Sequence, residues 1–314
     1  MVTGGAGFIG SHLVHRLLAQ GEKVTVIDDV STGRWENLET VENPANLTKV
    51  QARVSVLPDL EKQLIGSKQV FHLAAAVGVE LVVKSPIYTI ENNLQETEAV
   101  LTAASKTGVP VLLTSTSEVY GKSSKAEFSE HDDLTIGPPH LGRWSYACSK
   151  LMDEFLALAY HKEKQLPTTV VRLFNTVGPR QTGRYGMVLP RFITAAKAGK
   201  PLEVYGNGEQ TRCFCYVGDT VEALLRLSQT PSAIGEVVNI GSTEEISILG
   251  LAQRIIHMLG SNSEIVLKPY QEVYPAGFED MLRRKPSVQK LEKLTAFRPG
   301  TSLAKIITAT AATL

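Results

Sequence analysis

Cysteine is scarce in this sequence, and long apolar runs are missing. The three cysteines, Cys148, Cys213 and Cys215, are odd in number and too few for a disulfide framework, which favours a reducing cytoplasm. Cys213 and Cys215 form an isolated C-x-C without a second pair of ligands, so we predict packed thiols there and no metal site. No run reaches the ~20 apolar residues that span a bilayer, and we expect no signal peptide before the first motif.

Charge of one sign is not in excess either. Lysine plus arginine and aspartate plus glutamate both number 32, so the formal net charge is zero, and no basic block stands out. We therefore expect neither nucleic acid nor a membrane as a partner. With 43% hydrophobic and 20% charged residues, the 314-residue chain has the composition of a globular protein with a substantial core. A small molecule is the expected ligand.

The first half of the chain alternates short apolar runs with amphipathic stretches. The runs are rich in β-branched residues and apolar almost throughout, as in a parallel sheet covered by helices on both faces; they span residues 23–28, 69–75, 109–116 and 168–174. Helical patterns between them span residues 11–20, 93–106 and 145–164. This βαβ alternation predicts an α/β fold with a doubly wound parallel sheet.

The second half has longer loops rich in glycine and proline. Residues 201–219 predict a strand hairpin, 235–242 a buried strand that returns to the sheet, and 248–259 a helix. We predict a dinucleotide-binding domain over residues 1–174, to which the segment 214–241 returns. A smaller α+β substrate domain is expected over residues 175–314.

The stretch "TGGAGFIGSHL" carries Gly4, Gly7 and Gly10 directly before an amphipathic helix. Glycines allow the tight turn and the close backbone approach that a pyrophosphate needs, and the helix start offers unpaired N–H groups. Asp28 ends the next strand, near the ~20-residue spacing of a carboxylate that holds the adenosine ribose and repels a 2′-phosphate. The pattern predicts NAD rather than NADP. Only three residues precede these glycines, so we expect a start upstream of Met1 or a chain trimmed at this end.

Tyr146 and Lys150 are four positions apart in a helical pattern, so their side chains share a face. An ammonium near a phenol favours the phenolate and moves its pKa from about 10 toward working pH, which makes tyrosine a usable general base. The same spacing occurs by chance in many helices, where it means a buried ring beside a solvated amine. "TSTSEVYG", residues 114–121, favours the catalytic interpretation because it follows a buried strand, where doubly wound sheets place ligands.

Together with "HLAA", "YACSK", "RLFNTVGPRQ" and "VYGNGEQTRCFCYV", these motifs resemble the extended short-chain dehydrogenases that modify nucleotide sugars. The resemblance runs from residue 2 to about residue 300. It implies a Rossmann domain and a tightly held NAD that oxidises the sugar at C4 and is later regenerated. The implied substrate is a nucleotide sugar, and we expect it to be UDP-linked.

The resemblance also implies roles for single residues. Thr116, Tyr146 and Lys150 would form the catalytic triad, and Asn175 and Arg212 would contact the nucleotide diphosphate. The cofactor-binding residues that it implies are Gly4, Gly7, Phe8, Ile9, Gly10, Asp28, Asp59, Leu60, Leu73, Ala74, Ala75, Asn93, Tyr146 and Lys150.

Three further residues resemble one branch of the family. Ser117 and Glu118 in "STSEVYG", and Arg284 in "EDMLRRKPS", are similar to residues of the UDP-glucuronate decarboxylases, including the UDP-xylose and UDP-apiose/xylose synthases. We therefore expect these three residues to act in catalysis, with Arg284 also binding the C6 carboxylate of the sugar. Decarboxylation is coherent chemistry, because oxidation at C4 gives a β-keto acid.

Other functions stay open at this point. A 4-epimerase of UDP-glucose or UDP-glucuronate uses the same C4 oxidation, and residues 283–285 would then be a solvated charge run. A 4,6-dehydratase would pair Glu118 with an aspartate, where this chain has Ser117. A non-catalytic NAD-binding module usually lacks the tyrosine or the lysine. We order the alternatives as decarboxylase, epimerase, dehydratase and binding module.

Apolar residues on the catalytic helix cover more than one stripe: Leu151, Met152, Phe155, Leu156 and Leu158. One stripe suffices for packing on a sheet. The extra width predicts a second contact, and we expect a homodimer that uses this helix.

Overall fold

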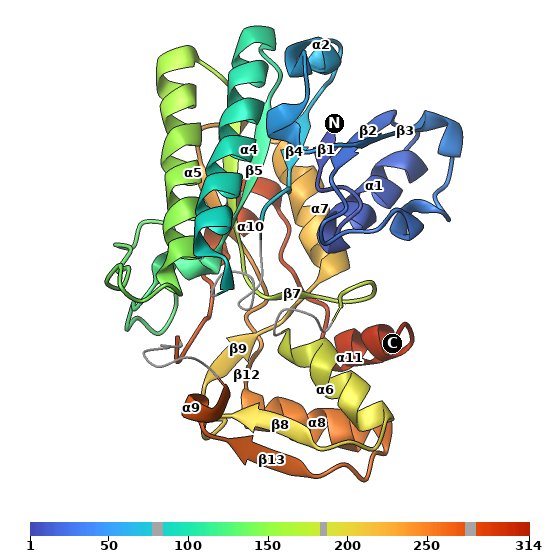
Figure 1. Ribbon diagram of the computed structural model, residues 1–314, viewed down its shortest axis with the longest axis vertical. Helices are drawn as coiled ribbons and strands as arrows, with labels where there is room; N and C mark the ends of the chain where they lie inside the picture. Colours follow the sequence, from blue (N-terminus) through green and yellow to red (C-terminus); the bar gives the residue numbers. More distant parts are fainter. Residues whose placement is uncertain (77–83, 183–186, 274–280) are drawn as a thin grey trace.

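A seven-stranded parallel sheet forms the centre of the larger lobe (Figure 1). The computed structural model describes residues 1–76, 84–182, 187–273 and 281–314. The strand order is β11-β6-β5-β4-β1-β2-β3. The strands are β1 (Val2–Thr3), β2 (Val24–Asp28), β3 (Leu47–Gln51), β4 (Val70–His72), β5 (Val111–Thr116), β6 (Thr168–Leu173) and β11 (Val237–Ile240). This order confirms the predicted doubly wound sheet, with its topological switch point between β1 and β4.

Helices cover both faces of the sheet because its strands are apolar on both sides. Leu112 and Val171 pack on the face covered by α1 (Phe8–Ala19), α7 (Val217–Ser228) and α10 (Gln289–Thr295). Their chain neighbours Leu113 and Val170 pack on the opposite face. There the covering helices are α2 (Leu60–Leu64), α4 (Pro86–Thr107) and α5 (Trp144–Lys164). In Figure 1, α4 and α5 run side by side along the length of the lobe.

The smaller lobe has its own apolar core, built around Leu189, Phe192 and Leu251. Its helices are α6 (Val188–Lys197), α8 (Ile248–Leu259), α9 (Tyr270–Val273) and α11 (Leu303–Ala311). Its strands are β7 (Thr176–Val177), β8 (Leu202–Tyr205), β9 (Thr211–Cys213), β10 (Cys215–Tyr216), β12 (Glu245–Ser247) and β13 (Ile265–Lys268). Short 3₁₀ helices in the chain are η1 (Trp35–Leu38), η2 (Pro44–Asn46), η3 (Val54–Val56), η4 (Ser117–Tyr120) and η6 (Pro231–Ala233).

The hairpin predicted over residues 201–219 is wrong. β8 pairs in parallel with β13, β9 pairs antiparallel with β12, and β10 pairs in parallel with β7. Between β8 and β9 the chain turns at Gly206 and Gly208, both at positive φ, and Gly208 lies against Leu249 of α8. Strands this short are paired by whichever segment reaches them, and here their partners lie far along the chain.

The division of the chain between the lobes is not a single cut. β11 pairs with β6 at the edge of the sheet, and α7 and α10 pack beside α1 on its face, so residues after 217 complete the larger lobe. The division at residue 174 stays a prediction. Of the helices in the part of the chain that the structure describes, none has both the length and the apolarity needed to cross a membrane.

Candidate active site

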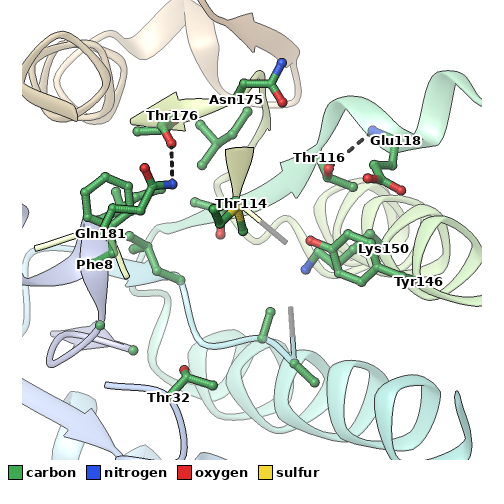
Figure 2. Close-up of a pocket in the computed structure, with 18 of the residues that line it drawn as sticks. Phe8, Thr32, Thr114, Thr116, Glu118, Tyr146, Lys150, Asn175, Thr176 and Gln181 are labelled. Carbon is green, nitrogen blue, oxygen red and sulfur yellow. Dashed lines mark hydrogen bonds between the residues drawn. The ribbon is translucent and has the colours of Figure 1, made fainter. Parts of the chain in front are cut away.

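A cavity of about 580 Å³ lies where the carboxyl ends of β1, β4, β5 and β6 meet the smaller lobe. Gly7 and Thr116 line it from the larger lobe, and Tyr205 and Arg212 line it from the smaller one. Figure 2 shows Thr116, Glu118, Tyr146 and Lys150 on one side of the cavity, with Phe8 and Gln181 across from them. This volume is that of a small-molecule site.

The glycine-rich turn leaves no room for side chains. A Cβ on Gly10 would lie 2.1 Å from the carbonyl oxygen of Gly4, and a Cβ on Gly4, at φ +70°, would lie 2.7 Å from the backbone nitrogen of Ala74. Gly7, at the N-cap of α1, makes no side-chain cap, so the first N–H groups of the helix face the cavity that Gly7, Phe8 and Ile9 line. Such a cradle fits a pyrophosphate.

Asp28 lies at the end of β2 and is 8% exposed. Its Oδ2 accepts a hydrogen bond from the backbone N–H of Ala6 at 2.9 Å, and its Oδ1 accepts one from Val30 at 2.8 Å. Burial raises the pKa of Asp28, and these backbone N–H groups partly offset that. Each oxygen keeps a further lone pair for the cavity, so Asp28 and the glycine cradle together fit the ribose and pyrophosphate of NAD.

Two predicted cofactor residues lie elsewhere. Asp59 and Leu60 stand at the start of α2 and do not line the cavity; the Asp59 carboxylate pairs with Lys62 at 3.0 Å and is 60% exposed. The cavity is lined instead by Ala52, Arg53 and Val54, which follow β3. Sequence reasoning did not predict β3, so the end of this strand was missed. Its position next to β2 is the signal that identifies it.

The segment Arg53–Val54 is held by a buried carboxylate from α4. Glu96, 3% exposed, accepts the backbone N–H of Val54 at 2.7 Å and the hydroxyl of Ser55. Its Oε1 also lies 3.3 Å from Nε of Arg53. Glu96 itself lines the cavity, so α4 contributes to its wall.

Asn93 supports the cavity from behind. Its Oδ1 accepts the backbone N–H of Ala76 at 2.8 Å, and its Nδ2 donates to the hydroxyl of Ser149 at 3.0 Å. It therefore joins the segment after β4 to the catalytic helix. Of the predicted cofactor-binding residues near it, Leu73, Ala74 and Ala75 line the cavity, whereas Asn93 does not.

The predicted triad is brought together. Thr116 ends β5, while Tyr146 and Lys150 project from the first turns of α5, and all three line the cavity (Figure 2). The Lys150 ammonium lies 2.7 Å from Oδ2 of Asp153.

The electrostatics of Tyr146 differ from the expectation. Burial raises the pKa of Tyr146, the Glu118 carboxylate raises it further, and a hydrogen bond with Thr116 offsets only part of this. Contrary to the expectation, the pKa of Tyr146 is therefore raised, and the Asp153 carboxylate adds to the rise. A positive charge brought beside Tyr146 would favour the phenolate.

Glu118 and Arg284 were predicted from separate motifs and form an ion pair. Nη2 of Arg284 lies 3.1 Å from Oε1 of Glu118, and Nη1 of Arg143 lies 2.7 Å from its Oε2. Burial alone would raise the pKa of Glu118, but the two guanidinium groups outweigh it and lower the value to about 2. Arg143 was missed, although it stands three residues before Tyr146, a spacing that places both on one helix face.

The three charged residues at positions 283–285 lie in different environments. Arg283 forms a bidentate pair with Glu245, with both distances 2.6 Å, and its side chain is 44% exposed. Lys285 pairs with Glu127 at 3.2 Å. Arg284, whose side chain is 10% exposed, lines the cavity. The solvated interpretation therefore fits Arg283 and not Arg284.

The smaller lobe supplies the far wall. Asn175 and Arg212 line the cavity, and their contact with the nucleotide diphosphate stays a prediction; Nδ2 of Asn175 donates to the carbonyl of Cys213 at 3.3 Å. The guanidinium of Arg191 stacks on the ring of Tyr205 at 4.1 Å. Sequence reasoning assigned no role to several further lining residues. Gln181, Tyr205 and Gln210 lie within the motifs quoted above, whereas Arg191 and Tyr270 lie outside any motif. Ser117 lines the cavity beside Glu118 and is buried.

Comparison with known proteins decides the family. Residues 1–241 match the model of the "NAD dependent epimerase/dehydratase family". The chain belongs to this family. It is 43% identical over 303 residues to a UDP-N-acetyl-alpha-D-glucosaminuronate decarboxylase of Bacillus cytotoxicus, covering 96% of this chain and 93% of that protein. It is 36% identical to UDP-glucuronic acid decarboxylase 4 of Arabidopsis thaliana, covering 96% of this chain and 65% of that protein.

Solved structures agree with these relatives. A UDP-glucuronic acid 4-epimerase from Bacillus cereus, in complex with UDP-glucuronic acid and NAD, has a TM-score of 0.88 and 30% identity; the match covers 99% of this chain and 97% of that one. Pal from Bacillus thuringiensis has a TM-score of 0.89 and 29% identity, covering 99% and 97%. The resemblance to the nucleotide-sugar enzymes is confirmed. The chain is an NAD-dependent enzyme of the decarboxylase and epimerase class.

Proposed function

We propose that this enzyme decarboxylates a UDP-linked hexuronate, with UDP-glucuronate as the first candidate. The observation that carries the proposal is the convergence of Arg143 and Arg284 on the Glu118 carboxylate, at 2.7 Å and 3.1 Å, in the cavity that Tyr146 also lines. Two guanidinium groups directed at one carboxylate make a site suited to a second carboxylate, because arginine stays charged and offers a fork of donors. A neutral hexose needs no such group.

The chemistry follows from these positions. Tyr146 takes the proton of the C4 hydroxyl, and Lys150 and Thr116 hold the groups around it. NAD, which the glycine cradle and Asp28 would hold, would supply the redox chemistry as acceptor and later donor of the C4 hydride. The resulting 4-keto acid loses carbon dioxide when its C5–C6 bond breaks and the electron pair moves to the C4 oxygen. After C5 takes up a proton, Tyr146 returns its proton as the C4 hydroxyl is restored.

Arg284 has a defined task in this scheme. The substrate carboxylate must lie within reach of a cation while the sugar is oxidised, and must then leave as a neutral molecule. A guanidinium shared with Glu118 meets both needs, because Glu118 can retain the cation when the substrate charge disappears. Arg143, on the same side as Tyr146, fixes Glu118 in place.

A second candidate is 4-epimerisation of UDP-glucuronate. It is supported by the structural similarity to the Bacillus cereus epimerase and by the shared C4 oxidation. The similarity to the Bacillus cytotoxicus enzyme adds a second uronate, the 2-acetamido sugar, to the substrates that must be compared.

The deciding experiment pairs four substrates with two matched variants. Purified enzyme is incubated with UDP-glucuronate, UDP-N-acetylglucosaminuronate, UDP-glucose and UDP-galactose, and products are identified by NMR while released carbon dioxide is quantified. We expect carbon dioxide from a uronate. Arg284→Ala should reduce that release by about 10²-fold or more. Arg283→Ala, its exposed neighbour, should stay near the wild-type rate. Interconversion of UDP-glucose and UDP-galactose, or of uronate epimers, without carbon dioxide would replace this proposal with the epimerase.

A homodimer is part of the proposal. Large apolar side chains on α4 and α5 face outward: Ile87 is 71% exposed, Met152 55% and Phe155 63%. The two helices lie side by side, and exposed apolar side chains of this size on both of them suit burial against a second copy of the chain. The three free cysteines support a cytoplasmic location, where thiols stay reduced.

A further inference from the structure

The catalytic lysine shares a buried ion pair that the reaction scheme does not use. Lys150 is 2% exposed and Asp153 is 0% exposed, and Nζ of Lys150 lies 2.7 Å from Oδ2 of Asp153, three residues on along α5. Among the described residues, Oδ1 of Asp153 has no hydrogen-bond partner. A fully buried carboxylate is costly unless it serves the charge beside it.

The neighbouring titratable groups do not compete for this ammonium. His72 on β4 binds Thr3 at 2.7 Å and Thr97 of α4 at 3.2 Å; burial lowers its pKa to about 3, and the Lys150 charge acts in the same direction, so the imidazole is neutral. Glu154 on α5 is held by a bidentate pair with Arg172, at 2.8 Å to 3.2 Å.

Two other charges act on Tyr146 from outside the pair. Glu118, after β5, raises the pKa of Tyr146, and Arg284, from the C-terminal part, lowers it. Both belong to the arginine cluster formed by Glu118, Arg143 and Arg284, and they are paired with each other. Asp153 is therefore the carboxylate that acts directly on Lys150.

We propose that Asp153 is a positioning residue for Lys150: it holds the ammonium at the floor of the cavity and stabilises its charge there. An ammonium has three donors and no acceptor. Asp153 engages one of them, which leaves two for Tyr146 and for groups bound in the cavity. Without the anion, a buried ammonium is expensive to keep charged. The inference rests on the use of Tyr146 and Lys150 in the proposed function, and it does not depend on which sugar is the substrate.

The first test measures NAD affinity of nucleotide-stripped protein, with no sugar present. Asp153→Asn keeps the shape and removes the charge, and should weaken NAD binding by about tenfold. Glu163→Gln, an exposed carboxylate on the same helix, should change nothing. In a Lys150→Met background, adding Asp153→Asn should cause no further loss, because the carboxylate acts through the lysine. An equal loss in both backgrounds would overturn the proposal, whatever the enzyme does with a uronate.

The second test is the pH profile of the first half-reaction, followed as bound NADH. If Asp153 sustains the Lys150 charge, Asp153→Asn should move the acid limb to higher pH by about one unit, since the phenolate loses a cation. If Asp153 is only an anion near Tyr146, the limb should move to lower pH; if its role is purely structural, the limb should not move. Either of these two results contradicts the proposal.

Should Asp153→Asn fail to fold, the double variant still decides. Lys150→Met alone leaves a buried carboxylate without its cation, so adding Asp153→Asn should raise the unfolding temperature. A double variant no more stable than Lys150→Met would mean that the two charges are not coupled, and the proposal would be wrong.

Discussion

Replacing Glu118 by Gln removes one charge from the arginine cluster and keeps the shape of the side chain. The pKa of Glu118 is lowered from 4.5 to about 2, chiefly because Arg284 and Arg143 outweigh the effect of burial. A carboxyl whose pKa is lowered on folding stabilises the folded state above its unfolded pKa, and this contribution is lost as the pH falls toward the folded value. At neutral pH the shift corresponds to about 3 kcal/mol.

The same linkage fixes how the effect depends on pH. At about pH 3.5 the contribution falls to roughly 2 kcal/mol, because the unfolded carboxyl is already protonated while the folded one is still ionised. An independent estimate agrees, since leaving a buried cation without its anion costs about 3–5 kcal/mol. Glu118→Gln should therefore lower the unfolding temperature at pH 7 by several degrees.

The assay is thermal unfolding of both proteins over this pH range, with Glu127→Gln as the control. Glu127 pairs with Lys285 and its side chain is 39% exposed, so its removal should have little effect. The difference in unfolding temperature between the wild type and Glu118→Gln should decrease as the pH falls. A difference in unfolding temperature that stays constant from neutral to acid pH would refute the reasoning, because the loss of stability would then be independent of the ionisation of Glu118.

Three further predictions concern catalysis, cofactor and assembly. Tyr146→Phe should lower turnover by about 10²-fold or more while NAD still binds; near-normal turnover would remove Tyr146 from the role of base. Asp28→Asn should reduce the preference for NAD over NADP in a binding titration, because the carboxylate no longer repels the 2′-phosphate; a wild type that binds both equally would contradict the role of Asp28. Phe155→Glu should shift the protein from dimer to monomer in size-exclusion chromatography with light scattering, whereas Glu163→Gln should not.

Much of the larger lobe could be predicted because its signals are local. An apolar run indicates that a strand is buried on both faces, and the glycines before α1 indicate where the chain must turn. The helix over residues 248–259 begins and ends where the pattern placed it. Pairing in the smaller lobe could not be predicted, since β8, β9 and β10 bond to strands up to about sixty residues away and nothing in a short strand names its partner.

The site divides in the same way. The spacing of Tyr146 and Lys150 and the strand end before Thr116 are properties of neighbouring residues, and the resemblance to the family implied that the three form a triad. Arg143 and Arg284 meet at Glu118 only because distant segments fold over the sheet, and Asp153 could not be given a role until its burial against Lys150 was seen. The pairing of side chains from distant segments could therefore not be predicted from the sequence.

The place of α7 has a consequence for synthesis. A nascent chain that has emerged to residue 174 carries β1 to β6 and α1, yet the leucines of α7 that cover α1, among them Leu224, have not been made. Until about residue 240 has been synthesised, α1 alone covers this face of the sheet, and the apolar residues that α7 would cover stay exposed; β11 can then also pair with β6. Such intermediates attract one another. A fragment of residues 1–174 should accordingly precipitate rather than bind nucleotide, and the nascent protein should depend on a holding chaperone during this interval.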